Sequence, residues 1–199
     1  KEEFTELMKS VKEFGEPGFV WSDSTELLVN PCVEIGMWPV CEKTKQSGWQ
    51  ACNLSTINCA KIKTEQDFFD ACRAATIIGT LQAGFAEFKY LGEASERIIS
   101  REALLGVSMT GIMEQHEICL DPTAQKRGAT IVKKTNKKIA ELIGINQAAR
   151  TTCIKPEGTS SCILGTSSGI HPHHAKRYIR RVQANKMEPI YNYFKEINP

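Results

Sequence analysis

The α/β character of this chain follows from residues 121–156, which read DPTAQKRGATIVKKTNKKIAELIGINQAARTTCIKP. Asp121 followed by Pro122 is a strong helix start, with an N-cap residue and a proline at the first helical position. Gly144 marks the expected end of this helix. Residues 151–155 are rich in β-branched side chains and precede a proline, which predicts a short strand. A long helix that leads into a strand is the unit from which α/β folds are built.

Apolar spacing and turn residues predict more helices around this unit. Gly15 ends the first of them, and Thr64 is a suitable N-cap for the second, which is expected to reach about Tyr90. Residues 103–108 fit a strand or a helix equally well. Few hairpin signals separate the elements, so the strands are expected to be parallel. The expected additional helices span residues 2–14, 64–90, 110–117 and 188–197.

The composition is that of an ordinary globular protein. The chain has 199 residues, of which 41% are hydrophobic and 24% charged, and this excludes a disordered or collagen-like chain. No apolar run approaches the ~20 residues of a membrane span, and the N-terminal residues lack the regions of a signal peptide. We therefore expect one unit over residues 1–199 in a soluble, cytoplasmic protein without membrane contact.

Eight cysteines are present, and no two of them form a CxxC pair. This pattern argues against a zinc ribbon, a thioredoxin-type motif and a disulfide framework, so most of the thiols are expected to be reduced and buried. We interpret Cys41, Cys59 and Cys72 as structural. The histidines at 171, 173 and 174 have no acidic or Cys partner at ligand spacing, so no metal site is expected.

Positive charge is concentrated in residues 118–187, which contain 13 Lys and Arg against 3 Asp and Glu. Such an excess suits an anionic ligand. The lysines at 133, 134, 137 and 138 are typical of the solvated face of a helix with apolar residues on its other side. We therefore expect no direct binding of nucleic acid.

The first candidate site is Asn30-Pro31-Cys32-Val33-Glu34. Pro31 disfavours a helical Asn30, which predicts an extended segment with Asn30, Cys32 and Glu34 on one face. A carboxylate beside the thiol should raise the pKa of Cys32, so loss of a hydrogen atom suits this sulfur better than attack as a thiolate. Glu34 would then take a proton from a substrate hydroxyl. The alternative is a turn before a strand, with one buried Cys.

Two further stretches complete the candidate chemistry. Cys52-Asn53-Leu54 provides a second thiol, which could donate reducing equivalents by forming a disulfide. The loop after the predicted strand offers successive amides and hydroxyls that could cradle a phosphate, although it lacks the P-loop pattern. The alternative for this loop is a surface turn with no ligand. Its proposed phosphate-binding residues are Pro156, Glu157, Gly158, Thr159, Ser160 and Ser161.

Together these stretches resemble the catalytic subunit of ribonucleotide reductases over nearly the whole chain. The shared motifs occur in the order found in that family. Residues 177–182, RYIRRV, are most similar to the adenosylcobalamin-dependent class II enzymes, and the position of His171 is usually acidic in class I. The other motifs are GEPG at 15–18 with WSD at 21–23, NPCVEI at 30–35, CNL at 52–54, LGVSMTG at 105–111, PEGTSS at 156–161 and GIHP at 169–172.

The resemblance implies a fold and a role for each site residue. Cys32 would form the thiyl radical at the tip of a central finger loop inside a ten-stranded α/β barrel. Glu34 would be the general base for the 3′ hydroxyl of a ribonucleotide, and Asn30 would hold the substrate hydroxyls. Cys52 would be one member of the redox pair that reduces the substrate, and thioredoxin or a similar dithiol would regenerate the pair.

The resemblance also implies that residues 1–199 are an internal segment of the catalytic barrel domain. In this family the partner of Cys52 lies on an earlier strand, and no cysteine precedes Cys32 in this sequence. The segment would therefore need the remaining strands of the barrel, or a second chain, for activity. Two alternatives stay open: a class I subunit whose radical comes from a metal-bearing partner, and a non-catalytic nucleotide-binding module.

Overall fold

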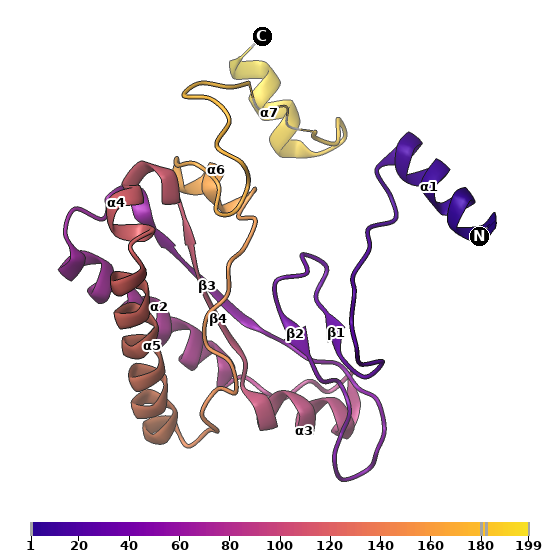
Figure 1. The fold of residues 1–199 in the computed structure, drawn as a ribbon, viewed down its shortest axis with the longest axis vertical. Coiled ribbons are helices and arrows are strands. Elements are labelled where there is room, and N and C mark those ends of the chain that lie inside the picture. The colour runs from indigo at the N-terminus through magenta and orange to yellow at the C-terminus, as the bar shows by residue number, and fades with distance from the viewer. Residues whose placement is uncertain (1, 180, 182, 199) are drawn as a thin grey trace.

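Two parallel strands form the centre of the structure, a computed structural model that describes residues 2–179, 181 and 183–198. Strand β3 (Asn53–Asn58) pairs with β4 (Leu105–Thr110), with Asn53 opposite Leu105 and Asn58 opposite Thr110. The parallel arrangement agrees with the sequence, and it resolves the ambiguity over residues 103–108 in favour of a strand. Figure 1 shows this pair at the centre of the molecule.

Residues 151–155 run along the free edge of β4, but they form less of a strand than expected. Val107 and Thr152 make a single parallel bridge. Around it, the Leu105 amide donates to the Arg150 carbonyl (3.0 Å) and the Cys153 amide donates to the Val107 carbonyl (3.1 Å). This segment therefore adds a third parallel line of chain to the sheet.

Helices α2 (Glu65–Ala83) and α5 (Pro122–Ile143) cover one face of these strands. A buried cluster joins the two layers, with Ile57 and Val107 from the sheet, Phe68 from α2 and Val132 from α5. Burying such side chains contributes roughly 1.5–3 kcal/mol each. This layer is the apolar core, and it fixes the strands in place.

The ends of these helices follow the sequence signals with one exception. Thr64 and Asp67 form a reciprocal capping box at the start of α2, and the Asp121 carboxylate accepts from the Ala124 amide (2.6 Å) at the start of α5. Gly144 ends α5 in the left-handed conformation, as expected. The prediction that the second helix reaches Tyr90 is wrong, because α2 ends at Ala83. The amides of Gly84 and Phe85 donate to carbonyls three residues earlier (3.1 Å each), which replaces the α-helical pattern there.

A short antiparallel hairpin was not expected from the sequence. It consists of β1 (Leu28–Val29) and β2 (Gly36–Met37), with Leu28 opposite Met37. The predicted helix over residues 110–117 is also only partly correct, because Thr110 ends β4 and a 3₁₀ turn follows. The remaining central elements are η1 (Cys59–Lys61), α3 (Gly92–Glu102), η2 (Ile112–Gln115), α4 (His116–Cys119) and α6 (Ser160–Leu164).

The two terminal helices are present as predicted, and both lie apart from the core. Helices α1 (Glu2–Phe14) and α7 (Pro189–Ile197) contain no buried residue, and Figure 1 shows them at the N- and C-terminal ends of the drawn chain. Within the described ranges, no helix has the length and apolarity needed to cross a membrane.

Asn136 is a fully buried polar residue that joins α2, α5 and the chain after α5. Its amide nitrogen donates to the Thr80 hydroxyl (3.1 Å), and its amide oxygen accepts from the Ala148 backbone (2.9 Å). These bonds satisfy groups that have no access to water. The turn after α5, which leads the chain back to β4, therefore depends on this side chain.

We predict that Asn136→Ala lowers the free energy of unfolding by about 2–3 kcal/mol, because it leaves the buried Ala148 amide unsatisfied. Urea unfolding measures the change. The neighbouring Lys137 is exposed, so Lys137→Ala serves as the control and should alter stability by no more than about 0.5 kcal/mol. Equal losses for the two variants would contradict the prediction.

Candidate active site

The loop between β1 and β2 carries Asn30, Cys32 and Glu34 in a tight turn. The Val33 amide donates to the Asn30 carbonyl (2.8 Å), and the Ile35 amide donates to the Asn30 side-chain oxygen (3.0 Å). Val33 adopts a left-handed φ of 64°. The predicted extended conformation is therefore wrong, because Asn30 closes the loop with both its backbone and its side chain.

Glu34 is buried and forms an ion pair with Lys155. The carboxylate oxygen Oε1 accepts from Lys155 Nζ at 2.8 Å, and the Glu34 side chain is only 3% exposed. Its second oxygen, Oε2, is buried and has no hydrogen-bond partner among the described residues. The pair joins the hairpin to the end of segment 151–155, which lies 121 residues later in the chain.

The environment keeps Glu34 ionised. Burial raises the pKa of the carboxyl, but hydrogen bonds from Lys155 and Asn30 and the charge of Lys155 outweigh it, so the pKa is lowered from its ordinary value. The pKa of Lys155 is raised from its ordinary value: burial lowers it, but the hydrogen bond and charge of Glu34, with contributions from Cys32 and Glu157, together outweigh burial. At neutral pH the site therefore contains a carboxylate beside an ammonium group.

Cys32 and the predicted phosphate loop line one cavity of about 490 Å³. Cys32 itself is exposed. Lys155 belongs to the same wall, followed by residues 156–160. The structure thus brings together residues of all three stretches that the sequence singled out, because Leu54 also lines this cavity, and Cys32 lies more than 120 residues from the phosphate loop.

The phosphate loop turns some of its polar groups inward. The buried Glu157 has a left-handed φ of 54°, and its carboxylate accepts from the Ser160 hydroxyl. Ser161 is fully buried, and its hydroxyl donates to the Gly158 carbonyl (3.1 Å). Thr159 is exposed and lines the cavity. Of the predicted phosphate-binding hydroxyls, that of Thr159 is therefore the most accessible to a ligand.

Cys52 lies beside a second sulfur, that of Cys153, which the sequence analysis did not single out. Both sulfurs flank Gly106 on β4: an added Cβ at this glycine would lie 3.2 Å from Cys52 Sγ and 3.0 Å from Cys153 Sγ. Cys153 lies in the predicted strand just before the phosphate loop, and this position in the sequence could have marked it as a candidate site residue. Cys52 does not line the 490 Å³ cavity.

Both of these thiols are protonated at neutral pH. Burial raises the pKa of Cys52 to about 12, with smaller contributions from Cys153 and Glu34. Burial also raises the pKa of Cys153 to about 11, and Glu34 adds to the effect. Because the charge of Glu34 raises the pKa of both thiols, we infer that the ion pair between Glu34 and Lys155 lies close to Cys52 and Cys153.

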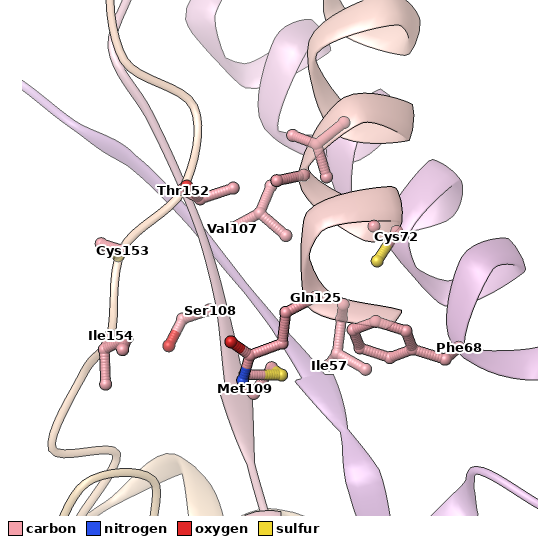
Figure 2. A pocket seen from close by; sticks show the side chains of 13 residues that line it. Ile57, Phe68, Cys72, Val107, Ser108, Met109, Gln125, Thr152, Cys153 and Ile154 are labelled. Atoms are coloured by element: carbon pink, nitrogen blue, oxygen red, sulfur yellow. The ribbon is translucent and has the colours of Figure 1, made fainter. Parts of the chain in front are cut away.

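A separate cavity of about 270 Å³ lies on the helix side of the sheet. Figure 2 shows Ile57, Phe68, Val107 and other mostly apolar side chains around it. The polar groups at its wall include Ser108 and Gln125, but no charged side chain lines it. The 490 Å³ cavity, which has a thiol, an ammonium group and a loop with exposed polar groups on its wall, is the better candidate for chemistry.

Comparisons with known proteins agree with the resemblance inferred from the motifs, although no family model matches the chain. The chain is 25% identical over 189 residues to the adenosylcobalamin-dependent ribonucleoside-triphosphate reductase of Lactobacillus helveticus, covering 81% of this chain and 24% of that protein. It is 24% identical over 203 residues to the probable enzyme of that type from Dictyostelium discoideum, covering 92% and 25%.

A solved structure supports the fold. The crystal structure of a B12-dependent class II ribonucleotide reductase aligns with a TM-score of 0.60 and 21% sequence identity, over 87% of this chain and 29% of that one. The predicted resemblance to the class II enzymes is thus confirmed, and the class I alternative is not favoured. This chain spans about a quarter of the length of the two relatives.

Arg180 and Val182, which belong to the class II motif at 177–182, lie outside the described residues.

We predict that Gly106→Ala lowers the free energy of unfolding by about 1–3 kcal/mol, because the new methyl group would overlap Leu54 and crowd the two sulfurs. Thermal unfolding measures the loss. Gly18→Ala is the matched control, since nothing lies within 4 Å of an added Cβ there. If both variants unfold at the same temperature, the close packing around Gly106 is disproved.

Proposed function

We propose that this chain is a segment, over residues 1–199, of the catalytic barrel domain of an adenosylcobalamin-dependent ribonucleotide reductase. The hairpin loop at residues 30–35 would be the finger loop of a ten-stranded α/β barrel. One observation carries the proposal: Cys32, the loop after residue 155, and Lys155, which forms the ion pair with Glu34, line one cavity. The names and the fold of the similar proteins agree with it.

In this proposal the 490 Å³ cavity holds a ribonucleotide. The phosphates would contact Gly158 and Thr159, with further positive charge from the basic stretch that contains Lys176 and Arg177. The ribose would then lie beside Cys32. Asn30 would contact the ribose hydroxyls through the second N–H of its amide nitrogen, because its amide oxygen accepts from the Ile35 backbone and its first N–H donates to Glu34.

Cys32 and Glu34 would act on the 3′ position of the ribose. A thiyl radical at Cys32 takes the 3′ hydrogen atom, and the unpartnered Glu34 Oε2 accepts the proton of the 3′ hydroxyl. The 2′ hydroxyl then leaves as water with a proton from one of two thiols. These thiols supply two electrons and two protons in all and become a disulfide, and the second proton ends as the new hydrogen at the 2′ carbon. Glu34 returns its proton to the 3′ oxygen, and Cys32 recovers its radical when the hydrogen atom returns to the 3′ position.

Adenosylcobalamin fits the exposure of Cys32. The sulfur is accessible from outside the chain, while Glu34, two positions later, is buried. When bound, this cofactor supplies the radical that removes the hydrogen atom from the Cys32 thiol. Cys32 is the residue that this chain would present to the cofactor. The described residues contain no group of three or more His, Cys, Asp or Glu side chains that could hold a metal ion.

The remaining partners follow from the same chemistry. Cys52 would be one of the two thiols that become oxidised, and thioredoxin or a similar dithiol would reduce the resulting disulfide. Residues 151–155 pair with β4 only on one side, and the rest of the barrel, or a second chain, would extend the sheet. All eight cysteines are free thiols, which supports a reducing compartment such as the cytoplasm.

The first test is ribonucleotide reduction by the full-length protein with adenosylcobalamin and a dithiol. We predict that Cys32→Ala abolishes deoxyribonucleotide formation, because it removes the only sulfur on the hairpin loop. Cys162→Ser, which alters another exposed thiol, should leave the rate unchanged. Activity that survives Cys32→Ala would disprove the radical role, and nucleotide binding without any turnover would favour the non-catalytic module.

The second test concerns the phosphate loop. We predict that Thr159→Glu weakens nucleotide binding at least about tenfold, or roughly 1.4 kcal/mol, because it places a negative charge on the exposed part of this wall. Equilibrium dialysis with a labelled ribonucleotide measures the dissociation constant. Thr159→Gln, which has a similar size and no charge, should change it by less than about threefold. The same affinity for both variants would remove the loop from the phosphate site.

A further inference from the structure

Lys155 has no role in the mechanism above, yet it is the cation that contacts Glu34. We propose that Lys155 is a positioning residue, whose ammonium group holds the Glu34 carboxylate ionised and oriented with one oxygen left for a ligand hydroxyl. The inference deepens the proposed function and rests on it. It extends the site by one residue, from the end of segment 151–155.

The backbone around Lys155 is held on two sides. Its amide donates to the Ser108 hydroxyl on β4 (3.3 Å), and its carbonyl accepts from the Ile170 amide (2.9 Å). Gly169 lies so close that an added Cβ would be 2.3 Å from the Lys155 carbonyl oxygen. The base of the side chain is therefore fixed before the side chain reaches the hairpin.

The side chain then reaches the carboxylate in a nearly dry environment. The Lys155 side chain is 16% exposed and that of Glu34 is 3% exposed, with 2.8 Å between Nζ and Oε1. Removing one partner from such a buried pair leaves an uncompensated charge, which is strongly unfavourable. The carboxylate orientation and its ionisation thus depend on the same contact.

The second carboxylate oxygen of Glu34, Oε2, links this contact to substrate binding. Lys155 occupies Oε1, while the buried Oε2 has no partner among the described residues. An unsatisfied buried acceptor is costly unless a donor meets it. A ligand hydroxyl beside Cys32 would be such a donor, and the fixed Oε1 contact determines which oxygen is available to it.

The other titratable groups near the pair do not replace the cation. Glu34 acts on the thiols of Cys52 and Cys153, which are protonated at neutral pH. Lys155 is also influenced by Cys32 on the hairpin and by Glu157 on the phosphate loop. These neighbours are thiols or a carboxylate. The cation that acts on Cys52 besides Lys155 is Arg150, and it is ion-paired with Glu102 (2.7 Å), so it does not take the place of Lys155 at Glu34.

Lys155 also lines the 490 Å³ cavity, and a direct contact with a substrate phosphate is the competing role. The two roles make different predictions. Loss of a phosphate contact weakens nucleotide binding and leaves the pH dependence of turnover unchanged. Loss of a positioning cation leaves nucleotide binding nearly unchanged and raises the pKa of Glu34, because burial then acts without an opposing charge.

The experiment uses the full-length protein with Lys155→Met, Lys155→Gln and Lys155→Arg. A base must be deprotonated to act, so turnover is lost as the pH falls through its pKa. We expect Lys155→Met and Lys155→Gln to move this acidic limb of the kcat profile upward by at least about one pH unit, with KM changed less than about threefold. With Lys155→Arg the acidic limb should lie at the same pH as in the unsubstituted protein, because the positive charge is kept. Lys134→Met, at an exposed position of α5, should not move the limb either.

A second readout does not need activity. The Glu34 carboxyl is titrated by ¹³C NMR in selectively labelled protein, with Glu34→Gln to assign the signal. We expect a pKa below the ordinary value in the unsubstituted protein and a higher one in Lys155→Gln. A Glu34 carboxyl that titrates at its ordinary pKa or above in the unsubstituted protein overturns the inference, even if no Lys155 variant folds.

Two further results also decide the question. A higher KM with an unmoved acidic limb would make Lys155 a phosphate contact and overturn the positioning role. If the full-length protein reduces no ribonucleotide, the proposed function fails, whereas the NMR titration still decides whether Lys155 holds Glu34 ionised.

Discussion

The parallel pairing of β3 with β4, continued by residues 151–155, is the constraint on which the rest of this structure depends. Parallel neighbours need long connections, and α2 with α3 and then α5 provide them. Because the strands run in one direction, the segments that follow them leave the sheet at the same edge. The phosphate loop follows residues 151–155, and at that end its residues line the cavity together with Cys32.

The ion pair between Glu34 and Lys155 then connects the hairpin to this sheet. Burying two charges costs several kcal/mol per ion before their attraction is counted, so such a pair is weak evidence for stability alone. It is better understood as a constraint on position. It brings the loop at residues 30–35, which has little regular structure of its own, to the wall of a cavity whose other residues come from β3 and from residues 155–163.

Much of the fold could be predicted from local signals. The Thr64 cap, the Asp121-Pro122 start and the Gly144 end all lie where the sequence places them, because capping uses groups within one turn of the helix. The early end of α2 at Ala83 was not predicted, since Phe85 and Phe88 continue an apolar pattern beyond the helix. Periodicity records which residues are apolar, and it does not record where the backbone turns.

The sequence by itself determined the α/β class, the starts of α2 and α5, the end of α5 and the residue types at the site, because these depend on neighbours along the chain. The tertiary structure alone decided that residues 30–35 form a turn, that Lys155 meets Glu34, and that Cys153 lies beside Cys52 across Gly106. The two long-range contacts depend on which strands are adjacent and how far each side chain reaches, whereas the turn is closed by hydrogen bonds of Asn30 within the loop. Contacts between residues more than 100 positions apart leave no periodic signal in the sequence, and packing fixes them.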